Sequence, residues 1–250
     1  MRIVKKAAAF IAAASAVLAM SGCMGLGSTE GLKPPTVRTY DYSKMHLVQL
    51  EEPYEGQPVA VIETSLGTIK AVLYPEYAPN TVNNFVNRVN EGFYNGKEIY
   101  NVIDKSIFMS GALDENRNSG VTEDGELIEN EYSVDLWPFK GAICSFNGRS
   151  GYGDSRFMVL NSRELSEESV ADLREFRNEN DEALPEELIQ AFLDKGVVID
   201  FSGAYTVFAQ TIEGMDVIAK ICSAEVSGEF SVPVEPIYVN NITIVDYHAG

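Results

Sequence analysis

The feature that most limits the fold of this chain is a series of short β-rich runs between residues 58 and 247. Each run is rich in Val, Ile, Phe or Tyr and is bounded by polar or Gly-containing segments, as strands of an all-β domain are. Many short strands with few helices favour one mainly β domain, a closed antiparallel barrel with two helices over its ends. The runs are VAVIET, TIKAVLY, EIYNVI, IFMSGAL, KGAICSF, RFMVLN, AYTVFAQTI and IYVNNITIVDY.

Two helical segments are expected among these strands. Pro79 suits the first turn of a helix, because an N–H at that position has no intrahelical partner. Behind it, apolar residues recur at helical spacing along one face, at Val82, Phe85, Val86 and Val89. A second helix is predicted to open at Gly214-Met215-Asp216. The connection Ser65-Leu66-Gly67, between the first two runs, has the length of a hairpin loop.

Residues 163–200 interrupt the β pattern with twelve acids against four basic residues. Two helical stretches are expected within them, at about Glu167–Arg177 and Pro185–Lys195. We interpret the segment as a solvated helical hairpin inserted in a domain of residues 57–250, with docking of basic partners as the alternative role. It leaves just before Phe201, so we expect it to lie near any groove that the flanking runs form.

The N-terminus has the pattern of an export signal. Cations among the first six residues precede residues 7–20, an uncharged run shorter than the roughly 20 residues of a spanning helix. The motif Met20-Ser21-Gly22-Cys23 follows and resembles the lipobox of bacterial lipoproteins, in which cleavage before the Cys leaves a lipidated thiol. We expect residues 1–22 to be a lipoprotein signal peptide and Cys23 to be lipid-anchored on the extracytoplasmic side of a bacterial membrane. An ordinary cleaved secretory signal and an uncleaved anchor are the alternatives.

Residues 23–56 are interpreted as the lipidated Cys and a stalk, with one short extended piece that packs on the domain as an option. The full chain has a net charge of −18, which becomes −21 when the three cations of residues 1–22 are removed. So acidic a chain is not expected to bind nucleic acid, and self-repulsion favours a monomer.

The remaining cysteines and histidines suggest no reactive or metal-binding centre. Cys144 and Cys222 lie in apolar contexts and are interpreted as buried small hydrophobes, with a disulfide between them as the alternative. His46 and His248 lie near the two ends, so neither a metal site nor a nucleophile–His pair is expected.

Four pieces of the chain, in order, resemble the cyclophilins, the barrel-shaped peptidyl-prolyl isomerases. They are ETSLGTIKAVLYPEYAPNTVNNFVNRVNEGFYNG, IYNVI followed by FM, KGAICSFNGRSGYGDSRFMVLN, and GAYTVFAQTIEGMDVI. The resemblance covers Pro58 to Tyr247, apart from the acidic insert. It implies catalysis of rotation about the X–Pro peptide bond, whose barrier is about 18–20 kcal/mol. No bond breaks, so no metal or cofactor is expected; the partners would be proline-containing polypeptides.

The resemblance also implies a catalytic position, and this chain departs from the family there. In the family an Arg donates a hydrogen bond to the prolyl nitrogen, whereas here the position is Asn101. Asn is shorter and uncharged, and charge-assisted hydrogen bonds are roughly twice as strong as neutral ones. By analogy with the loss of one oxyanion-hole donor, the rate is expected to fall by about 10²–10³.

Arg156 is the second catalytic candidate. It stands, like Gly111, where the family has a Gln. Since Gly111 and Asn101 both vacate volume, one hypothesis has the Arg156 guanidinium fill that space and partly replace the missing donor. The alternative is a solvated Arg156 paired with Asp154.

The substrate-binding residues are carried over from the family pattern position by position. Some of them, Phe108, Met109, Met158 and Tyr205, have plain core packing as an alternative, and Phe157 and Phe208 are interpreted as core. Phe146 is larger than the family's Ala and is expected to narrow the groove beside Asn147. The predicted substrate-binding set is Tyr100, Phe108, Met109, Gly111, Phe146, Asn147, Met158, Phe201 and Tyr205.

Two functions follow from these observations. The first is a membrane-tethered cyclophilin-type isomerase that assists folding of exported proteins, with activity reduced by Asn101. The second is a non-catalytic proline- or peptide-binding module that uses the same groove.

Overall fold

The computed structural model describes residues 40–103, 105–114, 117, 119–122, 124–148, 151–161, 165–178 and 180–249. The predicted signal peptide, the predicted lipidation site Cys23 and most of the predicted stalk lie outside these residues. Within the described part, no helix is long and apolar enough to cross a membrane.

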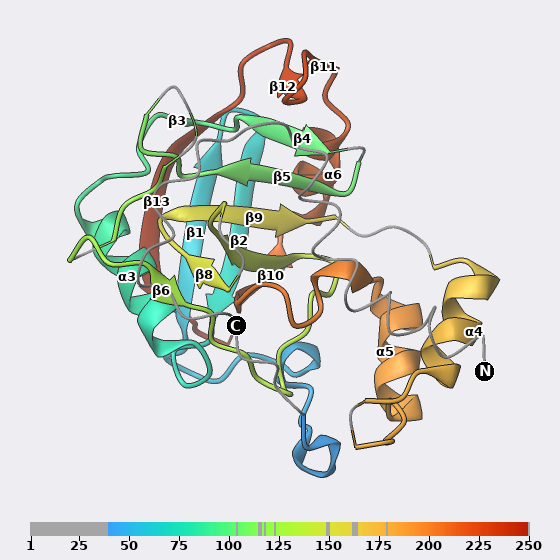
Figure 1. Ribbon diagram of the computed structural model, residues 1–250. Helices are drawn as coiled ribbons and strands as arrows, with labels where there is room; N and C mark the ends of the chain where they lie inside the picture. The colour runs from blue at the N-terminus through green and yellow to red at the C-terminus, as the bar shows by residue number, and fades with distance from the viewer. Residues whose placement is uncertain are drawn as a thin grey trace.

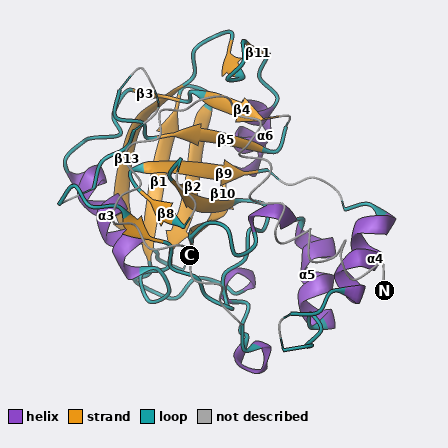
Figure 2. Cartoon of the chain, in the orientation of Figure 1, coloured by secondary structure: helices purple, strands orange, loops and turns teal. Residues whose placement is uncertain are grey.

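The protein is built on a curled antiparallel sheet with helices at its margins (Figures 1 and 2). The nine-stranded sheet has the order β3-β13-β1-β2-β10-β7-β9-β5-β4. The pairs β11-β12 and β6-β8 form two separate two-stranded sheets. This confirms the predicted mainly β barrel. The strands are β1 (Pro58–Thr64), β2 (Gly67–Leu73), β3 (Lys97–Glu98), β4 (Asn101–Ile103), β5 (Ile107–Ser110), β6 (Ile128–Glu129), β7 (Ala142–Phe146), β8 (Tyr152–Gly153), β9 (Arg156–Leu160), β10 (Val207–Glu213), β11 (Val226–Ser227), β12 (Val232–Pro233) and β13 (Tyr238–Asp246).

The curl of the sheet follows from its two edge strands, because β3 and β4 are consecutive in the chain. Ile99, between them, donates its backbone N–H to the Ile237 carbonyl at 2.8 Å, next to β13. The next residue, Tyr100, donates to the Met109 carbonyl of β5 at 3.1 Å. Adjacent residues therefore bond to opposite ends of the sheet, which brings those ends together. In Figure 1, β13, β1 and β2 accordingly lie behind β4, β5 and β9.

Strand alternation divides the side chains into an interior and an outer set. On β9, Phe157 and Val159 belong to the interior cluster, whereas Met158 and Leu160 belong to a second cluster on the outer face. Every residue of β7 and β9 is buried, so other segments cover this outer face too. Phe157 and Phe208 are core residues, as predicted.

The two predicted capping helices are present as α3 (Pro79–Asn90) and α6 (Met215–Cys222), and both contribute to the interior cluster. Glu131 caps the start of α3 by accepting the Asn80 and Thr81 backbone N–H groups at 3.0 and 2.8 Å. At the start of α6, Gly214 has φ +90°, and a Cβ there would collide with the Thr68 carbonyl. The hairpin between β1 and β2 has only Ser65 and Leu66 as its loop, because Gly67 pairs with Thr64.

The two cysteines outside the lipidation motif are both free and buried. Cys144 is in the outer cluster and Cys222 in the interior cluster, so the disulfide alternative does not hold. Burial raises the pKa of the Cys144 thiol, which keeps it protonated and unreactive at neutral pH.

The acidic insert forms α4 (Glu167–Glu175) and α5 (Glu186–Lys195), which lie beside the barrel in Figure 1. It is not simply a solvated hairpin, since its apolar side chains form a third cluster with Trp137 and Phe139. Trp137 and Phe139 contact the ring of Phe192 on α5, with centroids 5.7 and 5.6 Å apart. The charged residues occupy the other faces of these helices.

Packing also extends N-terminal to residue 57. Tyr42–Lys44 and Val48–Leu50 form 3₁₀ turns rather than the extended piece considered from the sequence. Gln49 is buried and accepts the Trp137 backbone N–H at 2.6 Å. Its amide donates to the Trp137 carbonyl and to Gln210 Oε1, each at 2.9 Å. Gln49 therefore clamps the end of the predicted stalk to the barrel.

The clamp predicts a measurable loss of stability. Gln49→Ala removes the acceptor of the buried Trp137 backbone N–H, whereas the Trp137 carbonyl keeps its bond from Phe139, so the free energy of unfolding should fall by about 1–3 kcal/mol in urea titrations. Gln190→Ala is the matched control, because Gln190 makes an exposed bond to Asp194 on α5. Equal effects of the two substitutions would contradict the clamp.

Candidate functional site

The predicted site residues converge on the outer face of β4, β5, β9 and β7. The register pairs Asn101 with Met109, Met109 with Met158, and Met158 with Cys144. Directly opposed residues share a face, so these four side chains form one row across the sheet. Met109 and Met158 are only 7% and 1% exposed, which makes the row an apolar floor shielded from water.

Phe108 lies on the other face of the same strand. It pairs with Val102 and Val159, and all three belong to the interior cluster. The structure therefore places the Phe108 side chain in the barrel core, where the core alternative put it, rather than beside Met109. Period-2 alternation along β5 is the physical reason.

Aromatic side chains form a cluster next to the methionine row. The Phe146 ring lies 6.2 Å from the Tyr205 ring, which lies 4.8 Å from the Phe201 ring in an edge-on arrangement. Burial raises the pKa of Tyr205 to about 12, so its hydroxyl stays protonated. Phe201 and Tyr205 also line a small open hollow together with Tyr40. No sequence pattern predicted that Tyr40, a residue of the predicted stalk, would lie beside Phe201 and Tyr205.

Asn101 does not present its amide freely. Its Nδ2 donates to the Phe230 carbonyl at 2.6 Å, and the backbone N–H of Val102 donates to the Ser231 carbonyl at 3.0 Å. Both acceptors lie between β11 and β12, the pair drawn above β4 in Figure 1. One amide hydrogen of Asn101 is thus used to hold this segment against the edge of β4.

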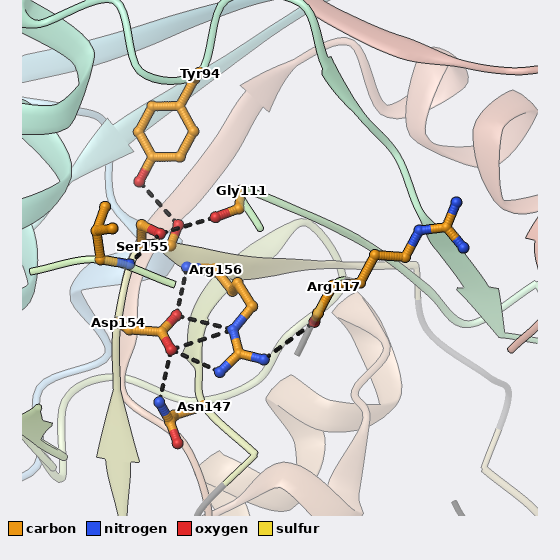
Figure 3. A network of polar contacts seen from close by, with 8 residues as sticks. Tyr94, Gly111, Arg117, Asn147, Asp154, Ser155 and Arg156 are labelled. Carbon is orange, nitrogen blue, oxygen red and sulfur yellow. Dashed lines mark hydrogen bonds and ion pairs between the residues drawn. The ribbon is translucent and has the colours of Figure 1, made fainter. Parts of the chain in front are cut away.

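Arg156 forms a buried ion pair with Asp154 (Figure 3). Its Nε lies 3.0 and 3.1 Å from the two carboxylate oxygens, and a terminal nitrogen donates to Oδ2 at 2.6 Å. Asp154 also accepts the Arg156 backbone N–H at 2.8 Å and the Asn147 amide at 2.6 Å. The paired side chains are 2% and 1% exposed. Asp154 is therefore the centre of the network, a role that sequence reasoning did not give it.

The position of Arg156 corrects both hypotheses drawn from the sequence. The predicted pairing with Asp154 is present, but the pair is buried rather than solvated. The guanidinium also lies 5.1 Å from the Phe146 ring centroid and donates to the Arg117 carbonyl at 3.3 Å. The guanidinium of Arg156 therefore uses its hydrogen bonds and charge within the protein and does not point them at a substrate.

Gly111 offers no empty volume for Arg156 to fill. A Cβ at Gly111 would collide with the Ser155 carbonyl and lie 3.2 Å from the Arg156 Cα, so the β9 backbone occupies that space. Ser155 Oγ donates to the Gly111 carbonyl at 2.8 Å, and the Tyr94 hydroxyl donates to the Ser155 carbonyl at 2.9 Å (Figure 3). Gly at this position is explained by close approach of two backbones.

The site as described is an apolar and aromatic cluster on the outer face of the sheet, without a reactive group. Among the described residues, no cluster of three or more His, Cys, Asp or Glu side chains is arranged to hold a metal ion. What the face offers is apolar and aromatic surface, protonated hydroxyls and amides.

The curled barrel, its two end helices and this outer-face cluster define a cyclophilin-like domain. The family model described as "Cyclophilin type peptidyl-prolyl cis-trans isomerase/CLD" matches residues 59–244, and the chain belongs to this family.

Similar proteins agree with this assignment. A Staphylococcus saprophyticus protein assigned by name to the peptidyl-prolyl cis-trans isomerases is 29% identical over 199 residues, covering 79% of this chain and 98% of the relative. A Staphylococcus haemolyticus protein of the same name is 27% identical, covering 79% and 97%. A crystal structure of a Cryptosporidium parvum cyclophilin type isomerase with the dipeptide ala-pro shares the fold, with a TM-score of 0.56 and 17% identity, covering 77% and 99%.

The buried ion pair predicts a strong asymmetry between substitutions. Asp154→Ala leaves the Arg156 charge buried without its counter-ion, so the free energy of unfolding should fall by about 3–5 kcal/mol. Glu213→Ala, which breaks the exposed pair with Lys70, should cost no more than about 1 kcal/mol. Asp154→Ala combined with Arg156→Met should recover part of the loss in chemical denaturation; a double variant no better than the single one would contradict the assignment.

Proposed function

We propose that the protein is a peptidyl-prolyl cis-trans isomerase that binds proline-containing polypeptides along the outer groove. The observation that carries the proposal is the row of Met109 and Met158 beside the ring of Phe146, in a domain of this family. An apolar, water-poor floor favours the rotating X–Pro bond, because the twisted amide has lost its resonance dipole and is less polar than the planar one. The relatives' names and the ala-pro dipeptide in the Cryptosporidium parvum structure support this substrate class.

We further propose that the activity is low. The family's charged donor is replaced by Asn101, and one Asn101 amide hydrogen is already bonded to the Phe230 carbonyl. The charge of Arg156, on the same face of β9 as Met158, is neutralised by Asp154. Both facts weaken stabilisation of the prolyl nitrogen in the transition state.

The same two facts favour a second candidate, a non-catalytic peptide holder. Such a protein would bind proline-containing segments without accelerating their isomerisation. The two candidates differ in a single measurement, the isomerisation rate at saturating protein.

The cellular setting is proposed from the sequence pattern of residues 1–23. Export and lipidation at Cys23 would place the groove beside newly translocated chains, where folding must proceed without ATP. The strongly negative charge of the chain favours a monomer there. Tethering raises the local concentration of groove and client, which helps a weak catalyst.

A donor substitution tests the catalytic proposal. In a protease-coupled assay with an Ala-Pro peptide, Asn101→Arg should raise kcat/KM at least about tenfold, since a charged donor is returned to the groove. Asn240→Arg makes the same charge change at an exposed position of β13 and should leave the rate unchanged. If the parent and Asn101→Arg both bind the peptide but neither exceeds the uncatalysed rate, the protein is the peptide holder.

The anchor is tested separately. Cys23→Ser should move the protein from the detergent phase to the aqueous phase in a phase-partitioning experiment on cell envelopes. The measurement is the fraction of protein in each phase, with Cys222→Ser as the control because Cys222 is buried in the core. Unchanged partitioning of Cys23→Ser would contradict lipidation.

A further inference from the structure

The predicted substrate-binding side chains of the outer face are largely closed off from solvent. Met109, Met158 and Phe146 are only 7%, 1% and 5% exposed. Phe201 and Tyr205 are partly buried and reach the surface at the small open hollow that they line. A peptide that contacts these residues therefore requires a covering segment to move away.

A segment from the N-terminal side, residues 40–50, reaches this hollow, and we name it the N-terminal strap. It is the blue chain at the bottom of Figure 1. Its first residue, Tyr40, lines the hollow together with Phe201 and Tyr205. A Cβ built on Gly203 would lie 3.7 Å from the Tyr40 hydroxyl oxygen. Tyr40 therefore lies against the loop that carries both predicted substrate-binding aromatic residues.

The strap is held in different ways at its two ends. Near its C-terminal end, Gln49 accepts the Trp137 backbone N–H at 2.6 Å, and the His46 backbone N–H donates to Asp135 Oδ1 at 2.6 Å. At its N-terminal end, the partly buried Tyr40 packs its ring 5.6 Å from the Trp137 ring. Breaking a bond to a buried backbone group leaves that group unsatisfied, whereas a ring contact is given up at lower cost. The Tyr40 end is therefore the end that can move.

We propose that the N-terminal strap is a lid on the candidate site, in which Tyr40 covers the end formed by Phe201 and Tyr205. A proline-containing peptide binds there when the Tyr40 ring swings away, while Gln49 keeps the rest of the strap in place. The inference rests on the proposed function and adds a conformational step to it. Because the competent state is only a fraction of the protein, the lid lowers the apparent affinity for the peptide.

Trp137 makes the movement observable. It is the single tryptophan of the chain, and it is buried with the Tyr40 ring against it. Departure of Tyr40 exposes one side of the indole to water, which shifts its emission to longer wavelength. Titration of the full-length protein with an Ala-Pro peptide should therefore shift the Trp137 emission, with a midpoint equal to the Kd measured by calorimetry.

Tyr40→Ala tests the proposal by removing the covering ring. We expect Kd and KM for the Ala-Pro peptide to fall about threefold to tenfold, the size of one aromatic ring contact, with kcat nearly unchanged. The emission of the unliganded variant should already be shifted, and the peptide should change it little. Tyr54→Ala is the matched control, because Tyr54 is exposed and bonds to Glu76. It should bind the peptide and shift the emission as the parent does.

The possible outcomes separate the lid from the proposed function. Weaker peptide binding by Tyr40→Ala would make Tyr40 part of the binding surface, and an unchanged Kd would show that it covers nothing. Either result overturns the lid and leaves the proposed function intact, since the parent still binds. If neither the parent nor Tyr40→Ala binds the peptide, the proposed function itself is contradicted. The melting temperature of Tyr40→Ala should stay within about 4 °C of the parent. Should the variant not fold, Tyr40→Leu, which keeps apolar packing without the ring, gives the same comparison.

Discussion

The change of hydrogen-bond partner between Ile99 and Tyr100 is the constraint on which the barrel and its groove both depend. Ile99 bonds toward β13 and Tyr100 toward β5, so the sheet closes where the chain passes from β3 to β4. The interior can then be filled by α3, α6 and alternating strand residues. The same change of partner determines which side chains of β4 face outward. It places Asn101 on the outer face, opposite Met109. Closure of the barrel and the geometry of the site therefore both depend on the change of hydrogen-bond partner between Ile99 and Tyr100.

The groove shows how a buried charge can be present without being available. Asp154 satisfies the backbone and side chain of Arg156 and the amide of Asn147 at once, so loss of that carboxylate would disturb several partners together. Desolvating such a pair is costly and is compensated only by good geometry. The result is a rigid floor under Phe146 rather than a mobile cation. Substrate chemistry is then left to neutral groups.

Local sequence signals predicted most of the fold, because hairpins, Pro-initiated helices and alternating strands are encoded within a few residues. The strands, α3, α6 and both insert helices appear close to their expected positions. The site was less predictable, since it depends on which residues face each other across strands. Phe108 was expected in the groove, yet the alternation of β5 turns it inward. Gly111 suggested free space, but only the structure shows the β9 backbone there. The burial of Arg156 and the clamp by Gln49 depend on residues that are far apart in the chain. A single amino-acid sequence does not show which of these residues come together.

The Gln49 clamp has a geometric consequence for a tethered protein. Because Tyr40 already packs against Trp137, at most residues 24–39 would separate Cys23 from the described fold, and a fully extended chain of that length spans about 55 Å. With a lipid on Cys23, this linker would keep the domain within a few nanometres of the bilayer surface. The domain would bind polypeptides that emerge within this distance of the membrane and would not reach those farther away. The packing of Tyr40 and the Gln49 clamp would then together limit how far the domain can move from the membrane.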